Sequence, residues 1–120
     1  RHLSRFAGLI GTVGSMEKKL LLTRVKKAIA EKIGSERLKG VFLFGSEARS
    51  TAMDSSDIDI FVILQGPVQF GPDLQEIISA TYSIQLEIDR FLHFVIADSK
   101  DYDSGEFSLY RTIKSEGVAA

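Results

Sequence analysis

The chain has 120 residues, of which 44% are hydrophobic and 26% charged, with a net charge of −1 and no cysteine. This composition is typical of one globular domain, and the near-neutral charge gives no general basic field for nucleic acid. The longest uninterrupted apolar run, residues 60–64, is far too short to span a bilayer. Absence of cysteine excludes disulfides and thiolate chemistry and fits a reducing compartment, so we expect a cytoplasmic protein.

Residues 1–15 differ in character from the rest of the chain. The sequence does not start with Met, and Gly14-Ser15-Met16 resembles a cloning scar ahead of a native start. We therefore interpret residues 1–15 as tag-derived sequence or a flexible N-terminal arm, and residues 16–120 as a single domain.

Residues 17–33 are predicted to form an amphipathic helix that ends at Gly34. Its apolar side chains recur at helical spacing, at Leu21, Leu22, Val25, Ile29 and Ile33. The opposite side carries much of the basic charge, at Lys18, Lys19, Arg24, Lys26, Lys27 and Lys32. We interpret this side as a solvated face, with a docking face for an acidic partner or RNA as the alternative.

An apolar run at residues 41–44 predicts a strand that is buried on both faces, followed by a turn at Gly45 and Ser46 that opens a short helix. Gly45 lacks a Cβ atom and would let the backbone approach a ligand, and the N–H groups at a helix start bind anions. The turn is therefore a candidate phosphate cradle. Arg49 could meet a phosphate, although bracing of the following loop is the favoured interpretation.

A second apolar strand follows a polar loop that Ser56 is expected to fix through a local hydrogen bond. Asp57 and Asp59 stand two residues apart where this strand begins, and side chains at that spacing share a face. Two neighbouring carboxylates repel, so we expect a hard cation between them. Oxygen ligands, with no Cys and few His in the chain, indicate Mg²⁺ or Mn²⁺. A metal beside a phosphate cradle is what nucleotidyl transfer to a hydroxyl requires.

At these residues the chain resembles the nucleotidyltransferase domains of the DNA polymerase β superfamily. Their pattern is Gly-Ser, an Arg three residues on, and Ser-Asp-hydrophobic-Asp about ten residues later. The chain meets it with Gly45, Ser46, Arg49, Ser56, Asp57 and Asp59, and departs from it with Ser50 where relatives often have Gly. The resemblance covers roughly residues 20–118. It is closest to the minimal nucleotidyltransferases, including those paired with HEPN proteins in toxin–antitoxin modules.

Residues 65–85 are predicted to form a loop and then a helix. Gly66-Pro67 and Gly71-Pro72 indicate two turns. Asp73 is predicted to cap the helix, with Glu76 completing a capping box. The buried stripe is expected at Leu74, Ile77, Ile78 and either Thr81 or Tyr82.

The resemblance implies a third carboxylate from a strand beside the aspartate pair. In related small domains a segment similar to residues 86–91 precedes the strand, which favours Asp89, with Glu87 as the alternative. Both would share one face if the strand had already begun there, and both are surface residues in the simplest interpretation. His93 falls on the same face and could approach the nucleotide, although a satisfied strand histidine is the favoured interpretation.

Residues 94–96 are expected to end this strand, and residues 99–104 to form a loop with solvated acidic side chains. A last short helix around Phe107 and Ile113 should stop at Gly117. The predicted fold is therefore α/β, with a small mixed β-sheet of three or four strands and flanking helices, as in polymerase-β-like nucleotidyltransferases.

The resemblance implies a metal-dependent transfer of AMP from ATP to a hydroxyl. Asp57 and Asp59 would bind Mg²⁺ or Mn²⁺, Asp89 would complete the site and take the acceptor proton, and Gly45 and Ser46 would hold the triphosphate. So short a chain is expected to borrow its acceptor surface from a second copy or a partner. A HEPN protein modified on a tyrosine would make the chain an antitoxin.

Two alternatives remain open. One is a small-molecule transferase acting, for example, on an aminoglycoside hydroxyl. The other is an antitoxin that works by binding alone, which an incomplete third carboxylate would favour. Nucleic acid and membrane are not expected as direct partners.

Overall fold

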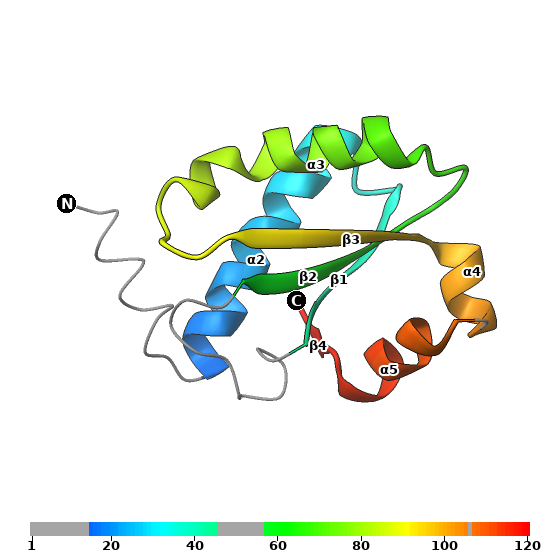
Figure 1. Cartoon of the computed structure of the whole chain (residues 1–120). Coiled ribbons are helices and arrows are strands. Elements are labelled where there is room, and N and C mark those ends of the chain that lie inside the picture. Colours follow the sequence, from blue (N-terminus) through cyan, green and yellow to red (C-terminus); the bar gives the residue numbers. More distant parts are fainter. Residues whose placement is uncertain (1–14, 46–56, 106) are drawn as a thin grey trace.

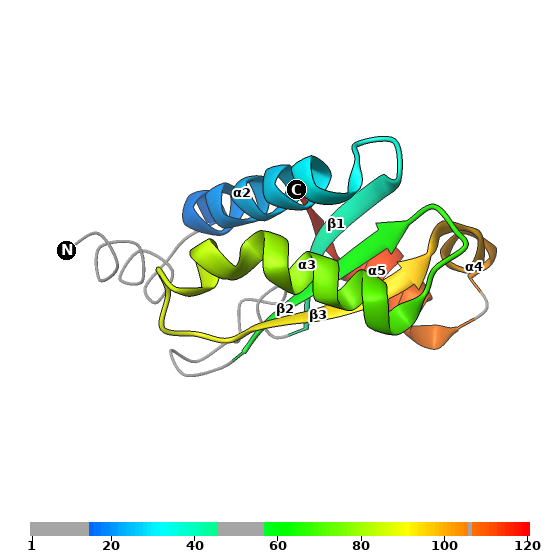
Figure 2. The ribbon, with the colours of Figure 1, turned by 90° about the horizontal axis from the view of Figure 1, so that it is seen from above.

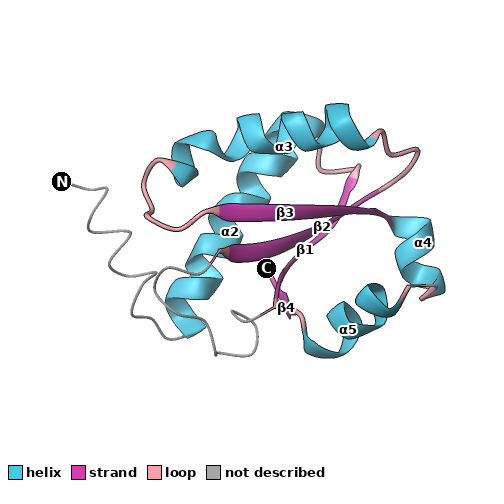
Figure 3. Cartoon of the chain, viewed as in Figure 1, coloured by secondary structure: helices cyan, strands magenta, loops and turns pink. Residues whose placement is uncertain are grey.

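The computed structural model describes residues 15–45, 57–105 and 107–120, with the side chains of 15–17 excepted. They form a four-stranded mixed sheet with helices on both faces (Figures 1 and 3). The strands are β1 (Leu38–Phe44), β2 (Ile58–Leu64), β3 (Leu92–Asp98) and β4 (Val118–Ala119), in the order β3-β2-β1-β4. β1 is antiparallel to β2 and β4, whereas β2 and β3 are parallel. The predicted α/β class is confirmed.

One face of the sheet is covered by α2 (Ser15–Ile33) and α3 (Phe70–Gln85), which lie side by side (Figure 2). The predicted stripe of α2 is confirmed, because four of its members are at most 2% exposed: Leu21, Leu22, Val25 and Ile29. Gly34 ends the helix as expected, with φ of +99° and its N–H donating to the carbonyl of Ala30. None of the described helices is long and apolar enough to cross a membrane.

The other face is covered by α4 (Ser99–Ser104) and α5 (Ser108–Glu116) over a small aromatic core. The prediction of a loop at residues 99–104 is wrong. Asp98 Oδ1 accepts a hydrogen bond from the Lys100 N–H at 2.8 Å and so caps a helical turn. Tyr102 then buries its ring against Phe61, and Gly105 closes the turn with φ of +67°. The last helix is confirmed, with Gly117 at its C-cap.

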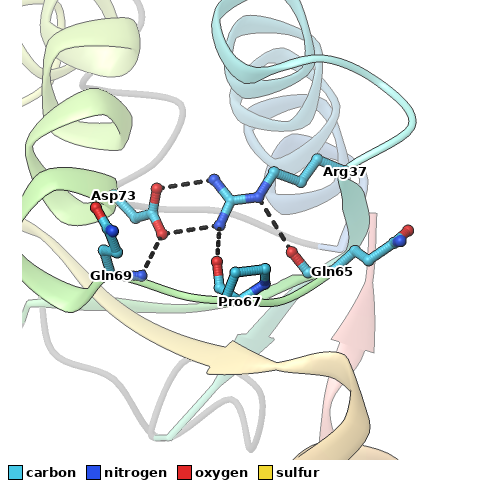
Figure 4. Close-up of polar contacts among 5 residues, drawn as sticks. All are labelled: Arg37, Gln65, Pro67, Gln69 and Asp73. Carbon is cyan, nitrogen blue, oxygen red and sulfur yellow. Dashed lines mark hydrogen bonds and ion pairs between the residues drawn. The ribbon is translucent and has the colours of Figure 1, made fainter.

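The predicted start of α3 is wrong. The helix begins at Phe70, and Asp73 is turned inward, where Arg37 donates to both of its carboxylate oxygens (Figure 4). With Asp73 inward, the buried stripe continues through Ile77, Thr81 and Ile84. Ile77 and Thr81 confirm the expected stripe, and Leu74 is partly buried against the core, whereas Ile78 is 47% exposed. Tyr82, the alternative to Thr81, is 58% exposed. Arg37 therefore pairs with an Asp73 that faces inward in the first turns of α3.

Strand alternation decides which face each residue of β2 occupies. Ile58 and Ile60 are fully buried against the α2 and α3 side, which confirms that they point into the core. Asp59 and Phe61 face the side of α4 and α5. β2 and β3 both begin at the end of the sheet away from α4 (Figure 1), so Asp59 lies at that end.

Candidate functional site

Asp59 lies between two strands at the end of the sheet where β2 and β3 begin. Its Cα partner is Phe44 on antiparallel β1 and His93 on parallel β3. Asp59 Oδ1 is 3.0 Å from His93 Nδ1, and the side chain of Asp59 is 27% exposed. The carboxylate is thus held in place while part of it remains accessible to a ligand.

Gly45 follows β1 directly and packs against this carboxylate. Its φ is +71°, a conformation that L residues with a side chain rarely adopt. A Cβ atom at this position would lie 2.5 Å from Asp59 Oδ2. The glycine bend and Asp59 are therefore neighbours, as the sequence predicts, and only glycine fits the space between them.

Asp57 is exposed and immediately precedes β2. The next residue, Ile58, donates its N–H to the carbonyl of Phe91 at 2.8 Å, which ties the entry of β2 to the segment that leads into β3. Asp57 therefore stands at the same end of the sheet as Asp59. Joint ligation by these two carboxylates stays a prediction.

The two candidates for a third carboxylate both precede the strand. Asp89 is exposed in a bend, and β3 begins only at Leu92, so alternation along a strand does not align it with Glu87. Glu87 accepts two hydrogen bonds from Arg24, at 2.8 and 3.1 Å, and so joins the turn after α3 to α2. No further contact within the described residues places Asp89 beside Asp59.

His93, not an acidic residue, occupies the β3 position beside Asp59. The sequence contained a signal for this arrangement. Asp59 and His93 are each the second residue of strands that run parallel and start at the same end of the sheet. The strand start could not be read because residues 86–89 also alternate apolar and polar side chains.

Ser46, Arg49 and Ser56 lie outside the described residues. Within the part of the chain that is described, no three His, Asp or Glu side chains form a metal-binding group. A metal bound with a nucleoside triphosphate needs few protein ligands, because phosphates and water supply the others. Asp59, whose side chain is partly exposed, suits that limited role.

The chain is also similar to solved structures and to a domain family. A candidate nucleotidyltransferase from Sulfolobus solfataricus shares 23% identity with a TM-score of 0.49, over 92% of this chain and 90% of that one. No curated protein shows significant sequence similarity to the chain. The family described as nucleotidyltransferase domain matches residues 22–103, which include Gly45, Asp59 and His93 and make up more than half of the chain. The chain therefore belongs to the nucleotidyltransferase domain family.

Proposed function

We propose that this protein transfers AMP from ATP to a hydroxyl group in a reaction that depends on a divalent metal. The observation that carries this proposal is the carboxylate of Asp59 at the start of β2, packed against the Gly45 bend. Because the chain belongs to the nucleotidyltransferase domain family, we interpret the bend as a phosphate-binding turn beside an acidic residue.

Each proposed site residue has a chemical role. Asp57 and Asp59 would hold Mg²⁺ or Mn²⁺, which when bound neutralises charge on the triphosphate. Gly45 leaves the bend open to phosphate oxygens, and the neighbouring Ser46 would bind them, supported by Arg49 and Ser56. The attacking oxygen forms a bond to the α-phosphorus as the bond to pyrophosphate breaks.

Asp89 is proposed to receive the proton that the attacking hydroxyl loses. Its exposed position in the bend before β3 leaves it accessible to a bulky acceptor. A carboxylate that faces solvent suits this role, and Asp89 would also complete the set of metal ligands.

We further propose that the acceptor is a tyrosine of a HEPN-type protein and that the chain is its antitoxin. The described residues form one sheet with its covering helices and include no separate domain for an acceptor. The acceptor surface would then belong to the partner.

The test is transfer of label from α-³²P-labelled ATP to a HEPN protein in the presence of Mg²⁺ or Mn²⁺. Asp59→Asn should abolish the labelling, and Asp101→Asn, an exposed carboxylate on α4, should leave it unchanged. Labelling that persists in Asp59→Asn contradicts the proposal. Labelling of an aminoglycoside in place of the protein points to a small-molecule transferase.

A specific observation favours a second function, an antitoxin that acts by binding alone. The position on β3 beside Asp59 carries an imidazole where a third carboxylate was expected. The double variant Asp57→Asn, Asp59→Asn separates the two functions. If it still neutralises the partner's RNase activity, binding suffices, whereas lost neutralisation with intact complex formation supports catalysis.

A further inference from the structure

We infer that His93 is a metal ligand alongside Asp59 and that it makes the site prefer a first-row transition-metal ion over Mg²⁺. This inference rests on the proposed function, because it concerns the metal of the same site. It replaces the expectation of oxygen-only ligands with a mixed set of carboxylate and imidazole. The evidence is the position of His93, its contact with Asp59 and the chemistry of its ring.

The backbone brings the two side chains together independently of their rotamers. Asp59 and His93 are direct partners in the parallel ladder of β2 and β3, so their side chains leave the sheet on the same face. They also lie at the open end of that ladder, where the first paired residues are Ile58 and Leu92. A shared ligand at this point needs no rearrangement of the sheet.

The distance between the donor atoms suits a shared metal. Asp59 Oδ1 and His93 Nδ1 are 3.0 Å apart. Adjacent ligands of an octahedral ion with bonds near 2.1 Å are separated by about 3 Å. The two atoms that form a hydrogen bond without metal are therefore already spaced as neighbouring ligands.

The side chains of Asp59 and His93 are also accessible to solvent. His93 is 52% exposed and Asp59 27% exposed, so neither is sealed into the core. Gly45 keeps a Cβ atom away from Asp59 Oδ2, on the other side of the carboxylate. Asp57, triphosphate oxygens or water could supply the remaining ligands.

The chemistry of the ligands decides which metal ion the site prefers. Mg²⁺ favours oxygen ligands almost exclusively, whereas imidazole nitrogen binds well to cobalt, nickel and zinc ions. A His93 nitrogen in place of an oxygen ligand should weaken the binding of Mg²⁺ and strengthen the binding of these ions. An oriented histidine that merely donates to Asp59 would not change the preference in this way.

The experiment titrates the full chain with Co²⁺ alone and with Mg²⁺ alone by calorimetry, and records the visible absorption of bound Co²⁺. We expect Co²⁺ to bind at least tenfold more tightly than Mg²⁺. His93→Asp should reduce that ratio about tenfold and shift the Co²⁺ spectrum toward oxygen ligation. His93→Asn, which can still donate to Asp59, should weaken Co²⁺ about tenfold with little effect on Mg²⁺.

Matched variants locate the ion. The chain has two histidines, so His2→Ala should leave Co²⁺ binding unchanged, whereas Asp59→Asn should abolish it. The inference is overturned if the wild-type chain does not bind Co²⁺, if His93→Asn binds it unchanged, or if the signal follows His2. Thermal unfolding of each variant confirms that it is folded.

Failure of the proposed function gives a different result. Co²⁺ binding that depends on His93, in a protein that transfers no nucleotide to any acceptor, supports the inference and contradicts catalysis. Nucleotide transfer with Mg²⁺, in a protein whose Co²⁺ binding is unchanged by His93→Asn, supports catalysis and overturns the inference.

Discussion

Two aspartates that lie near opposite ends of β2 have different surroundings. Asp73 lies near the end of the strand, where both of its oxygens accept hydrogen bonds from Arg37 and one also accepts from the Gln69 N–H (Figure 4). Its side chain is only 11% exposed. Asp59 lies at the start of the strand and, among the contacts within the described residues, pairs with the exposed ring of His93.

The comparison shows how the partners of a carboxylate determine its role in the protein. Arg37 neutralises Asp73, and its hydrogen bonds hold the pKa of that carboxyl below the ordinary value despite partial burial. Arg37 also donates to the carbonyls of Gln65 and Pro67, so it fastens the end of β2 to the start of α3. Asp59 has no arginine against it in the described structure and keeps an accessible oxygen for a ligand. We therefore assign a stabilising role to Asp73, whereas a functional role for Asp59 is our proposal.

The largest expected effect is on activity, from Asp59→Asn. Removing the charge should lower nucleotide transfer at least 100-fold, because the amide is a poor ligand for a divalent metal. The free energy of unfolding should change by less than about 1 kcal/mol, since the side chain is partly exposed and no cavity forms. Steady-state transfer assays and urea unfolding measure the two quantities. A large loss of stability would mean that Asp59, like Asp73, mainly stabilises the fold.

Arg37→Met should have the opposite profile. It leaves Asp73 charged and nearly buried without its partner, which should cost about 1–3 kcal/mol after allowance for the partial exposure of the pair. Activity per folded molecule should remain near that of the wild type. Urea unfolding checks the cost, with Lys39→Met, an exposed residue of β1, as the matched control within about 0.5 kcal/mol. Loss of activity in fully folded Arg37→Met would mean that the contacts at this end of β2 also contribute to nucleotide transfer.

Gly45→Ala tests how tightly the bend and Asp59 are packed. The new Cβ atom would meet Asp59 Oδ2 and the backbone would be held at an unfavourable φ, so we expect a loss of about 1–2 kcal/mol together with reduced transfer. Gly34→Ala is the control. Its φ of +99° is also unfavourable for alanine, but no atom beyond its chain neighbours lies within 4 Å of the added Cβ, so we expect a loss of about 1 kcal/mol with unchanged transfer. Equal effects at the two glycines would contradict the close packing at Gly45.

The smallest expected effect is a pH dependence at the Asp73 end. Because the folded pKa of Asp73 is lowered below 3.8, its ionised form stabilises the fold above that pH. The stabilisation is lost as the pH falls through the lower folded pKa. The difference in unfolding free energy between the wild type and Asp73→Asn should therefore shrink from pH 6 to pH 2. A constant difference over this range would mean that ionisation of Asp73 contributes little.

Much of the fold follows from local patterns. The stripe of α2 and its glycine stop are set by helical periodicity and by a conformation that glycine adopts easily. The apolar runs of β1 and β2 are strands because both faces of a central strand are covered. The same patterns place Gly45 at the end of one strand and Asp59 at the start of the next.

The errors arise where a distant residue decides the outcome. Asp73 has the sequence of a helix cap, but it lies inside α3 and pairs with Arg37, 36 residues away. β4 is only two residues long, and its identity as a strand comes from pairing with β1. Such contacts leave no periodic signal in their own segment.

The sequence by itself determined α2, the strands β1 and β2, the glycine bend, the acidic start of β2 and the family resemblance, because each depends on neighbours along the chain. Only the tertiary structure decided that His93 stands beside Asp59 and that Glu87 is bound to Arg24. Both outcomes follow from strand register and helix packing, which join residues tens of positions apart. A shift of one residue in that register would turn His93 to the opposite face of the sheet.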